Sequence, residues 1–199
     1  MFTGIIEEIG TVRAVKRSGI SSFIEIQAEK VLEDVHVGDS IAVNGVCLTV
    51  THFGSGIFRA DVMNETLSRS SLASLTAGSP VNLERAMAAN GRFGGHIVSG
   101  HIDGTGVISD IRNDGIAVWY TISTSAEIMR YIVEKGSVAI DGISLTVAEK
   151  FEDSMRVCII PETLARTNLR NWGVGTIVNV EVDMLGKYIE NFLKERDLA

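Results

Sequence analysis

The sequence contains a long internal repeat. Residues 38–50 read GDSIAVNGVCLTV, and residues 135–147, 97 positions further along, read KGSVAIDGISLTV. Two more pairs of segments align at the same shift: VMNETLSRSSL (62–72) with IIPETLARTNL (159–169), and GSPVNLERAM (78–87) with GTIVNVEVDM (175–184). Over residues 39–50, 62–72 and 78–87, 16 of the 33 aligned pairs are identical. Because this repeat is too long for a solenoid unit, it predicts two copies of one folded domain.

The repeat also sets the expected domain boundaries. Near the N-terminus a shift of 96 places FTGIIEEIGTV (2–12) on VSGHIDGTGVI (98–108), which one insertion or deletion explains. The stretch AMAANGRFGG (86–95) is the natural joint. Each half is long enough to form its own core. We therefore expect three parts: an N-terminal domain at 1–86, a C-terminal domain at 87–184, and a tail at 185–199.

Each copy has the pattern of a small all-β domain. β-branched runs surround an Asn-Gly pair at 44–45 and an Asp-Gly pair at 141–142, which favour tight hairpins. Residues 23–28 (FIEIQA) and 178–182 (VNVEV) alternate apolar and polar side chains, as half-buried strands do. Many short strands with few helices predict one small closed barrel per copy.

Short helices are expected between the strands. One begins at Glu65, and its counterpart follows Pro161, a residue type favoured at a helix start. A further helix is expected at 125–134, because Thr124 and Glu127 have the spacing of a capping box.

The tail lies outside the repeat and has helical periodicity. Its apolar side chains recur on one face: Leu185, Tyr188, Ile189, Phe192 and Leu193. This stripe could pack on the parent domain or on copies of itself, and packing on the parent domain is the simpler expectation. Two heptads are too few to indicate a coiled coil.

Composition narrows the classes of function. The net charge of −7 argues against a nucleic-acid-binding surface, which needs clustered Lys and Arg. The N-terminal MFTGIIEEIG lacks the basic and apolar regions of a signal peptide. No apolar run approaches the ~18 residues of a membrane span. Cys47 and Cys158 are the only cysteines and form no CxxC motif. We therefore expect a cytoplasmic protein that handles small molecules.

Several polar positions are the same in both copies. The matched pairs are Ser40/Ser137, Thr49/Thr146, Glu65/Glu162 and Thr66/Thr163. Such hydroxyls and glutamates can simply satisfy backbone groups at turns and in first helical turns. Alternatively, they belong to a pair of similar pockets that hold a planar polar ligand.

Ionisable or nucleophilic side chains occur at other matched positions in one copy only. These pairs are Ile5/His101, Gly38/Lys135, Cys47/Ser144 and Ala86/Asp183. Each has an ordinary explanation alone, since a lone cysteine in a strand is usually a small buried hydrophobe. Together, the four asymmetries indicate two related binding halves that are only jointly equipped for catalysis.

Competing motifs give weak signals. GRFGGH (91–96) lacks the Lys-Ser/Thr of a phosphate loop, and no GxSxG elbow supports a serine hydrolase. His96, His101 and Asp103 have no further Cys/His cluster at tetrahedral spacing, so we expect no metal site.

The motifs together resemble one known family. Riboflavin synthase, alpha-chain type, has similar motifs in this order: MFTGII, NGVCLTV, GGHIVSGHIDGTG, DGISLTV and IPETLARTNL. The resemblance covers essentially the whole chain. It implies two tandem six-stranded Greek-key β-barrels, followed by an oligomerisation helix at 185–199 that joins the subunits into a homotrimer.

The resemblance also implies a transferase that uses two molecules of one substrate. A four-carbon unit moves from one 6,7-dimethyl-8-ribityllumazine to another, giving riboflavin and 5-amino-6-ribitylamino-uracil. No cofactor or metal is implied, because the lumazine ring is the electron sink. Association with lumazine synthase is left open. The alternatives are a non-catalytic lumazine- or flavin-binding protein and a structural double barrel.

Site residues follow from the resemblance position by position. The implied catalytic residues are Ser40, Cys47, His101 and Thr146, with functionally implicated matches at Phe2, Lys135 and Asp183. The implied substrate-binding residues are Gly4, Ile5, Ile6, Cys47, Leu48, Thr49, Asp61, Val62, Met63, Asn64, Glu65, Thr66, Gly100, His101, Ile102, Lys135, Ser144, Leu145, Thr146, Pro161, Glu162 and Thr163. Val46 departs from the cysteine that many members carry before Cys47.

The site is expected between the N-terminal barrel of one subunit and the C-terminal barrel of the next. That placement would bring Cys47 of one chain towards His101 and Lys135 of another. His101 is the natural base for the 7-methyl group of one lumazine, since imidazole titrates near neutrality. Cys47 or Ser40 would add to the partner lumazine or orient a water that does.

Overall fold

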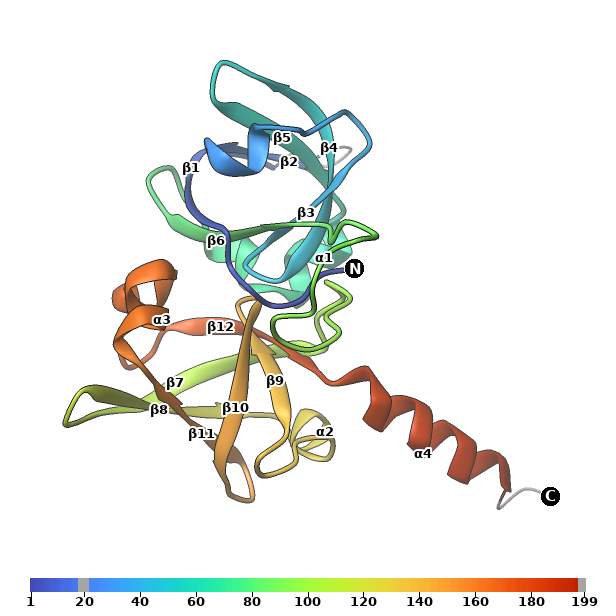
Figure 1. Cartoon of the computed structure of the whole chain (residues 1–199), viewed down its shortest axis with the longest axis vertical. Coiled ribbons are helices and arrows are strands. Elements are labelled where there is room, and N and C mark those ends of the chain that lie inside the picture. Colours follow the sequence, from blue (N-terminus) through green and yellow to red (C-terminus); the bar gives the residue numbers. More distant parts are fainter. Residues whose placement is uncertain (18–21, 197–199) are drawn as a thin grey trace.

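The computed structural model describes residues 1–17 and 22–196, which form two closed six-stranded barrels (Figure 1). The first barrel contains Glu8–Lys16 (β1), Ser22–Gln27 (β2), Ser40–Val43 (β3), Val46–Gly54 (β4), Ile57–Val62 (β5) and Pro80–Arg85 (β6). The second contains Gly104–Asp114 (β7), Ala117–Thr124 (β8), Ser137–Ile140 (β9), Ile143–Lys150 (β10), Ser154–Ile159 (β11) and Ile177–Val182 (β12). The prediction of one closed barrel per copy is confirmed.

The two barrels share strand order and irregularities. Neighbouring strands follow the order β1-β2-β5-β4-β3-β6 in the first barrel and the equivalent order in the second, and all pairs are antiparallel. The strand register slips at matched places: Val12/Ala14 and Val50/His52 in the first barrel, and Ile108/Asp110 and Val147/Glu149 in the second. The duplication therefore extends to local bends that a β-bulge imposes.

Short helices occupy the strand connections. They are Lys30–Leu32 (η1), Asn64–Arg69 (α1), Ser71–Ser74 (η2), Ala126–Met129 (α2), Pro161–Arg166 (α3) and Asn168–Asn171 (η3), before the C-terminal Met184–Arg196 (α4). The helices expected at Glu65 and after Pro161 are confirmed as α1 and α3. The predicted cap of α2 is wrong: Ser125 accepts the bond from Ile128 N–H, while Thr124 donates to the Thr105 carbonyl. This helix is a single turn.

Side-chain alternation separates the core from the outer face of each barrel. On β4, Val46, Leu48 and Val50 are buried in the first core, whereas Cys47 and Thr49 face outward. On β10, Ile143, Leu145 and Val147 are buried in the second core, whereas Ser144 and Thr146 face outward. Since strand side chains alternate, the polar residues of both LTV motifs lie on outer barrel surfaces.

The two barrels meet at their tightest turns. The Asn44-Gly45 turn lies directly against the Asp141-Gly142 turn, and a Cβ on Gly45 would lie 2.6 Å from the Gly142 nitrogen. Asn82 Nδ2 donates to the Asp141 carbonyl at 3.0 Å, and its counterpart Asn179 Nδ2 donates to the Asn44 carbonyl at 2.8 Å. This contact region between the barrels, which we call the seam, therefore has approximate twofold symmetry.

Asp141 departs from this symmetry. Asp141 is 3% exposed and occupies the place that Asn44 holds in the first copy. Its Oδ1 accepts a bond from Asn179 N–H at 2.8 Å, as Asn44 Oδ1 does from Asn82 N–H. Burial raises the pKa of Asp141 from 3.8 to about 7, because the charged form is removed from water.

Helix α4 extends away from the second barrel (Figure 1). Its apolar side chains are 56–63% exposed: Leu185, Tyr188, Ile189, Phe192 and Leu193. Polar contacts attach the other face, with Lys187 Nζ 2.6 Å from Asp103 Oδ1 and Glu190 bonded to Tyr131 and Arg130. The expectation that the stripe packs on the parent domain is therefore wrong. Residues 197–199 of the predicted helix lie outside the described residues.

None of the helices in the described part of the chain is long and apolar enough to cross a membrane.

Replacing Gly45 tests the seam. Gly45→Ala adds a Cβ that overlaps the Gly142 backbone at a φ of +78°. We expect the free energy of unfolding to fall by more than about 4 kcal/mol, measured by urea denaturation. Gly78→Ala is the control, because Gly78 has a φ of +91° and no neighbour within 4 Å. That variant should lose only the strain of a left-handed residue, about 1–2 kcal/mol. Equal losses in both variants would contradict the tight turn contact.

The buried carboxylate predicts a pH-dependent stability. The pKa of Asp141 in the folded protein lies above its unfolded value of 3.8. The contribution of Asp141 to the free energy of unfolding is therefore intact below pH 4 and is lost as pH rises through about 7. In the wild type, the free energy of unfolding should fall by up to about 4 kcal/mol between pH 4 and 8, measured by denaturation at several pH values. Asp141→Asn should abolish this fall. Asn44→Asp places a carboxylate at the matched position and should deepen the loss. A wild-type profile identical to that of Asp141→Asn would contradict this account.

Candidate functional site

The segment that leads into each barrel crosses to the other barrel. The Gly4 carbonyl accepts a bond from Ser144 N–H at 2.8 Å, and the Gly100 carbonyl accepts one from Cys47 N–H at 2.8 Å. Ile6 packs against the second core, and Ile102 packs against the first. Residues 4–6 are therefore part of the second barrel's surface, and residues 100–102 are part of the first.

Two buried carboxylates hold these lead-in segments. Glu84 on β6 accepts bonds from Thr3 N–H at 2.7 Å, Thr3 Oγ1 at 2.8 Å and Gly4 N–H at 3.0 Å. Glu181 on β12 accepts the equivalent bonds from Ser99 and Gly100 at 2.6, 2.8 and 3.0 Å. Burial raises the pKa of each carboxyl, and the donated bonds oppose that rise. Our sequence analysis missed both residues, although their identity in the repeat was a usable signal.

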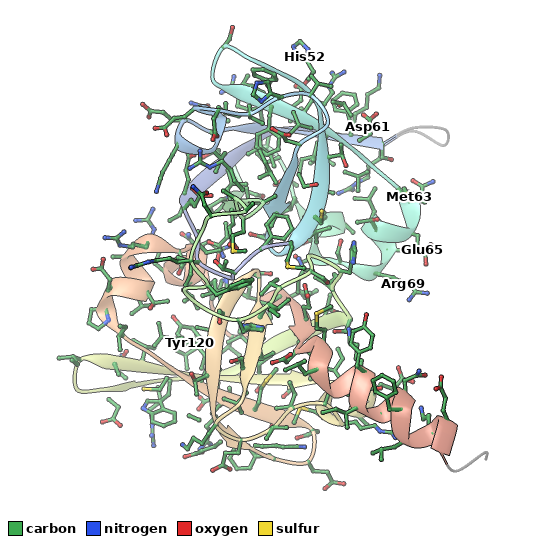
Figure 2. The ribbon with its side chains drawn as sticks, turned by 45° about the vertical axis from the view of Figure 1, so that its right-hand side comes forward. His52, Asp61, Met63, Glu65, Arg69 and Tyr120 are labelled. Carbon is green, nitrogen blue, oxygen red and sulfur yellow. The ribbon has the colours of Figure 1, made fainter. Side chains whose placement is uncertain are left out.

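The N-terminal candidate site lies on the outer face of the first barrel. Cys47 and Thr49 project from β4, with Ser40 of β3 directly opposite Thr49. Residues 61–66 run from β5 into α1, and Figure 2 shows Asp61, Met63 and Glu65 along one side of this barrel. Residues 100–102 lie beside Cys47. Within these segments Leu48 and Val62 point into the core and form the wall beneath the site.

The C-terminal candidate site repeats this arrangement. Ser144 and Thr146 project from β10, with Ser137 opposite Thr146. Residues 161–163 begin α3, and residues 4–6 lie beside Ser144. The residue before each helix is an exposed apolar one, Met63 at 72% and Ile160 at 56%. An apolar side chain beside exposed hydroxyls suits a flat heteroaromatic ligand with polar edges.

Glu65 and Glu162 have matching partners. Glu65 Oε1 lies 3.3 Å from Arg69 Nε, and Glu162 is bonded to Arg166 one turn along α3. All four side chains are mostly exposed, so these pairs add little to stability.

The structure brings Cys47 and the His101 segment together within one chain. Since Cys47 N–H binds the carbonyl next to His101, the expectation that a second chain is needed for this approach is wrong. The Cys47 side chain packs on a small cluster at the seam, formed by Phe2, Ala42, Val98 and Ala139. It is therefore partly a seam residue, while Thr49 and His101 are exposed.

Three other predicted residues have clear structural contacts. Phe2 is 0% exposed and pairs with Val98 in a β-bridge, so its ring packs at the seam. Asp183 Oδ1 accepts a bond from Leu185 N–H at 3.0 Å and so caps α4. Lys135 is exposed before β9, with its Nζ donating to the Ala148 carbonyl at 3.0 Å.

Cavities lie at the margins of the candidate sites, and one of about 170 Å³ is lined by Ser40 together with Asp39 and Ala86. A cavity of about 390 Å³ is lined by Ile5, Arg85 and the linker residue Arg92, and one of about 300 Å³ lies at Asp103 and Tyr131. Neither is lined by the outward residues of β4 or β10. Residues 1–17 and 22–196 contain no group of three His, Cys, Asp or Glu side chains placed to hold a metal ion.

Comparison with known proteins agrees with the duplicated fold. The family described as "Lumazine binding domain" matches twice, at residues 3–86 and 99–183. Riboflavin synthase of Actinobacillus pleuropneumoniae is 61% identical, over 98% of this chain and 91% of the relative. Riboflavin synthase of Bacillus subtilis is 51% identical, over 97% of this chain and 90% of the relative. The crystal structure of LumP complexed with riboflavin superposes with a TM-score of 0.84 at 25% identity, covering 92% of this chain and 99% of LumP.

Neutralising one buried carboxylate tests the crossed arrangement. Glu181→Gln removes the charge that holds Ser99 and Gly100, and bonds to charged groups are worth about 1.5–3 kcal/mol. We expect amide hydrogen exchange at Cys47, in the opposite barrel, to become at least about tenfold faster. Glu84→Gln is the matched variant and should instead speed exchange at Ser144. Equal responses of both amides to both variants would show that the segments are not held separately.

Proposed function

This chain belongs to the riboflavin synthase family of lumazine-binding proteins, and on that premise we propose its reaction. Two molecules of 6,7-dimethyl-8-ribityllumazine react by transfer of a four-carbon unit, giving riboflavin and 5-amino-6-ribitylamino-uracil. The enzyme is a transferase that needs no added cofactor, because the lumazine ring accepts the electrons. One observation carries the proposal: each barrel presents the same outward surface, completed by the lead-in segment of the other. Two copies of one surface suit a reaction between two copies of one molecule.

The outward residues supply the chemistry of the first site. His101 is exposed beside Cys47 and is the candidate base for the 7-methyl proton of one lumazine. Cys47 and Ser40 are the candidates that add to the other lumazine or orient a water, and Thr146 of the second site is a further candidate catalytic residue. A thiol acts as a nucleophile only as thiolate, and Lys135 of an adjacent subunit is the candidate cation to stabilise it. Binding both rings in register supplies a large part of the rate, since orientation can be worth ~7–11 kcal/mol.

A homotrimer is part of this proposal. The apolar face of α4 is exposed to solvent, and so are outward residues of both candidate sites. A neighbouring subunit would bury these surfaces. The opposite barrel of that neighbour would bring the two bound lumazines together. We place the enzyme in the cytoplasm, because Cys47 and Cys158 are both free thiols. Association with lumazine synthase would deliver the substrate directly.

A non-catalytic lumazine- or flavin-binding protein is the second candidate. LumP, which was crystallised with riboflavin and with 6,7-dimethyl-8-(1'-D-ribityl) lumazine, has the same two-barrel fold. The comparisons do not favour this alternative, because relatives named riboflavin synthase are 42–61% identical, against 25% for LumP.

Turnover tests the proposed function directly. Purified protein mixed with 6,7-dimethyl-8-ribityllumazine alone should produce riboflavin, followed by its visible absorbance, with binding read in parallel by fluorescence. Cys47→Ser and His101→Gln should each retain more than about a thousandth of kcat/KM, because orientation persists in both. Cys158→Ser, which changes an exposed thiol on β11, is the control and should match the wild type. Binding without turnover in the wild type would make the protein a lumazine carrier.

A further inference from the structure

His96 contacts Ser144, an outward residue that differs between the two sites. Its Nδ1 lies 2.7 Å from Ser144 Oγ, at the position that Cys47 holds in the first barrel. The second site therefore pairs a hydroxyl with an imidazole at the position where the first site has a thiol.

The backbone around this pair leaves little freedom. His96 N–H donates to the Thr3 carbonyl at 3.1 Å, and Ser144 N–H donates to the Gly4 carbonyl at 2.8 Å. Gly95 passes so close that a Cβ there would lie 2.7 Å from Ser144 Oγ and 2.2 Å from the Thr3 oxygen. Imidazole and hydroxyl are therefore held in one relative position by the lead-in segment.

The surroundings of the imidazole indicate which nitrogen carries the proton. His96 Nε2 is buried and has no hydrogen-bond partner in the described part of the chain. A buried N–H without an acceptor is rarer in proteins than an under-used acceptor, so the proton is expected on Nδ1. Burial lowers the pKa of His96, while the nearby Asp183 opposes this effect, so the ring is neutral at physiological pH.

We infer that His96 is a positioning residue for Ser144: its Nδ1–H donates to Ser144 Oγ, and the hydroxyl hydrogen of Ser144 is thereby directed away from the imidazole. The second site then offers a hydrogen-bond donor to a carbonyl oxygen or ring nitrogen of the bound heteroaromatic. The first site offers the Cys47 thiol, a weak donor, at the same place. The two sites thus differ in the strength of the hydrogen-bond donor that they present at this position. This inference depends on the proposed function for the ligand, but not for the His96–Ser144 contact.

The protonation of His96 is tested without any ligand. The full-length protein, labelled with ¹⁵N-histidine, should show His96 as the neutral Nδ1–H tautomer by long-range ¹H–¹⁵N NMR at pH 7. The chain has four histidines, and the signals lost in His96→Asn identify the residue. A neutral Nε2–H tautomer at His96 would overturn the inference.

Ligand binding tests the consequence. Riboflavin is titrated into the protein by fluorescence, with Thr49→Ala and Thr146→Ala assigning the binding steps to the first and second sites. His96→Leu should weaken the second-site step about threefold to tenfold and leave the first unchanged. Ser144→Ala should have a similar effect, and the double variant should lose no more than either alone. His96→Asn should restore most of the affinity, because its Nδ2 can donate from nearly the same place as Nδ1.

The outcomes separate this inference from the proposed function. Equal weakening of both steps by His96→Leu, no weakening at all, or additive losses in the double variant would overturn the positioning role, whatever the turnover. If the wild type binds riboflavin but makes none, the proposed reaction fails. The inference then stands or falls on the tautomer and the second-site affinity.

Discussion

The hydrogen bonds of two buried carboxylates position the parts of both candidate sites. Glu84 and Glu181 lie in different barrels, and each binds the backbone of the segment that leads into its own barrel. A carboxylate buried in protein needs several donors to remain charged, so these segments are tied to rigid barrel walls. Only from that anchored position can each segment continue across the seam. The location of His101 beside Cys47 therefore depends on a side chain of the second barrel that touches neither residue's reactive atoms.

The seam and the outer faces are under different constraints, which explains where the two copies diverge. Gly45 and Gly142 are in such close contact that neither can carry a side chain, and both copies retain glycine there. Two residues after these glycines, Cys47 and Ser144 are half-buried and face outward, where the two copies carry different side chains. Divergence at these positions can give the two sites different chemistry without disturbing the frame.

Much of the fold was predictable from the sequence, because the repeat and the alternation of β4 and β10 can both be read directly from the residues. The crossing of the lead-in segments was not, since aligning two copies does not reveal which barrel a segment binds. The exposed face of α4 was mispredicted because periodicity identifies an apolar stripe but not what covers it. His96 was considered only as a metal ligand, because nothing in the sequence shows that its ring lies against Ser144. The site residues themselves came from family resemblance, and their roles stay predictions.

The crossed lead-in segments have a consequence for the origin of this architecture. A single barrel with its own lead-in segment could make the same contacts only by pairing with a second copy about a twofold axis. In such a pair Gly4 of each copy would lie on the β-hairpin of the other, just as Gly4 and Gly100 do here. The present chain therefore has the geometry of an isologous dimer fused end to end. Fusion removes the requirement that both halves be identical, so each half became free to acquire residues the other lacks.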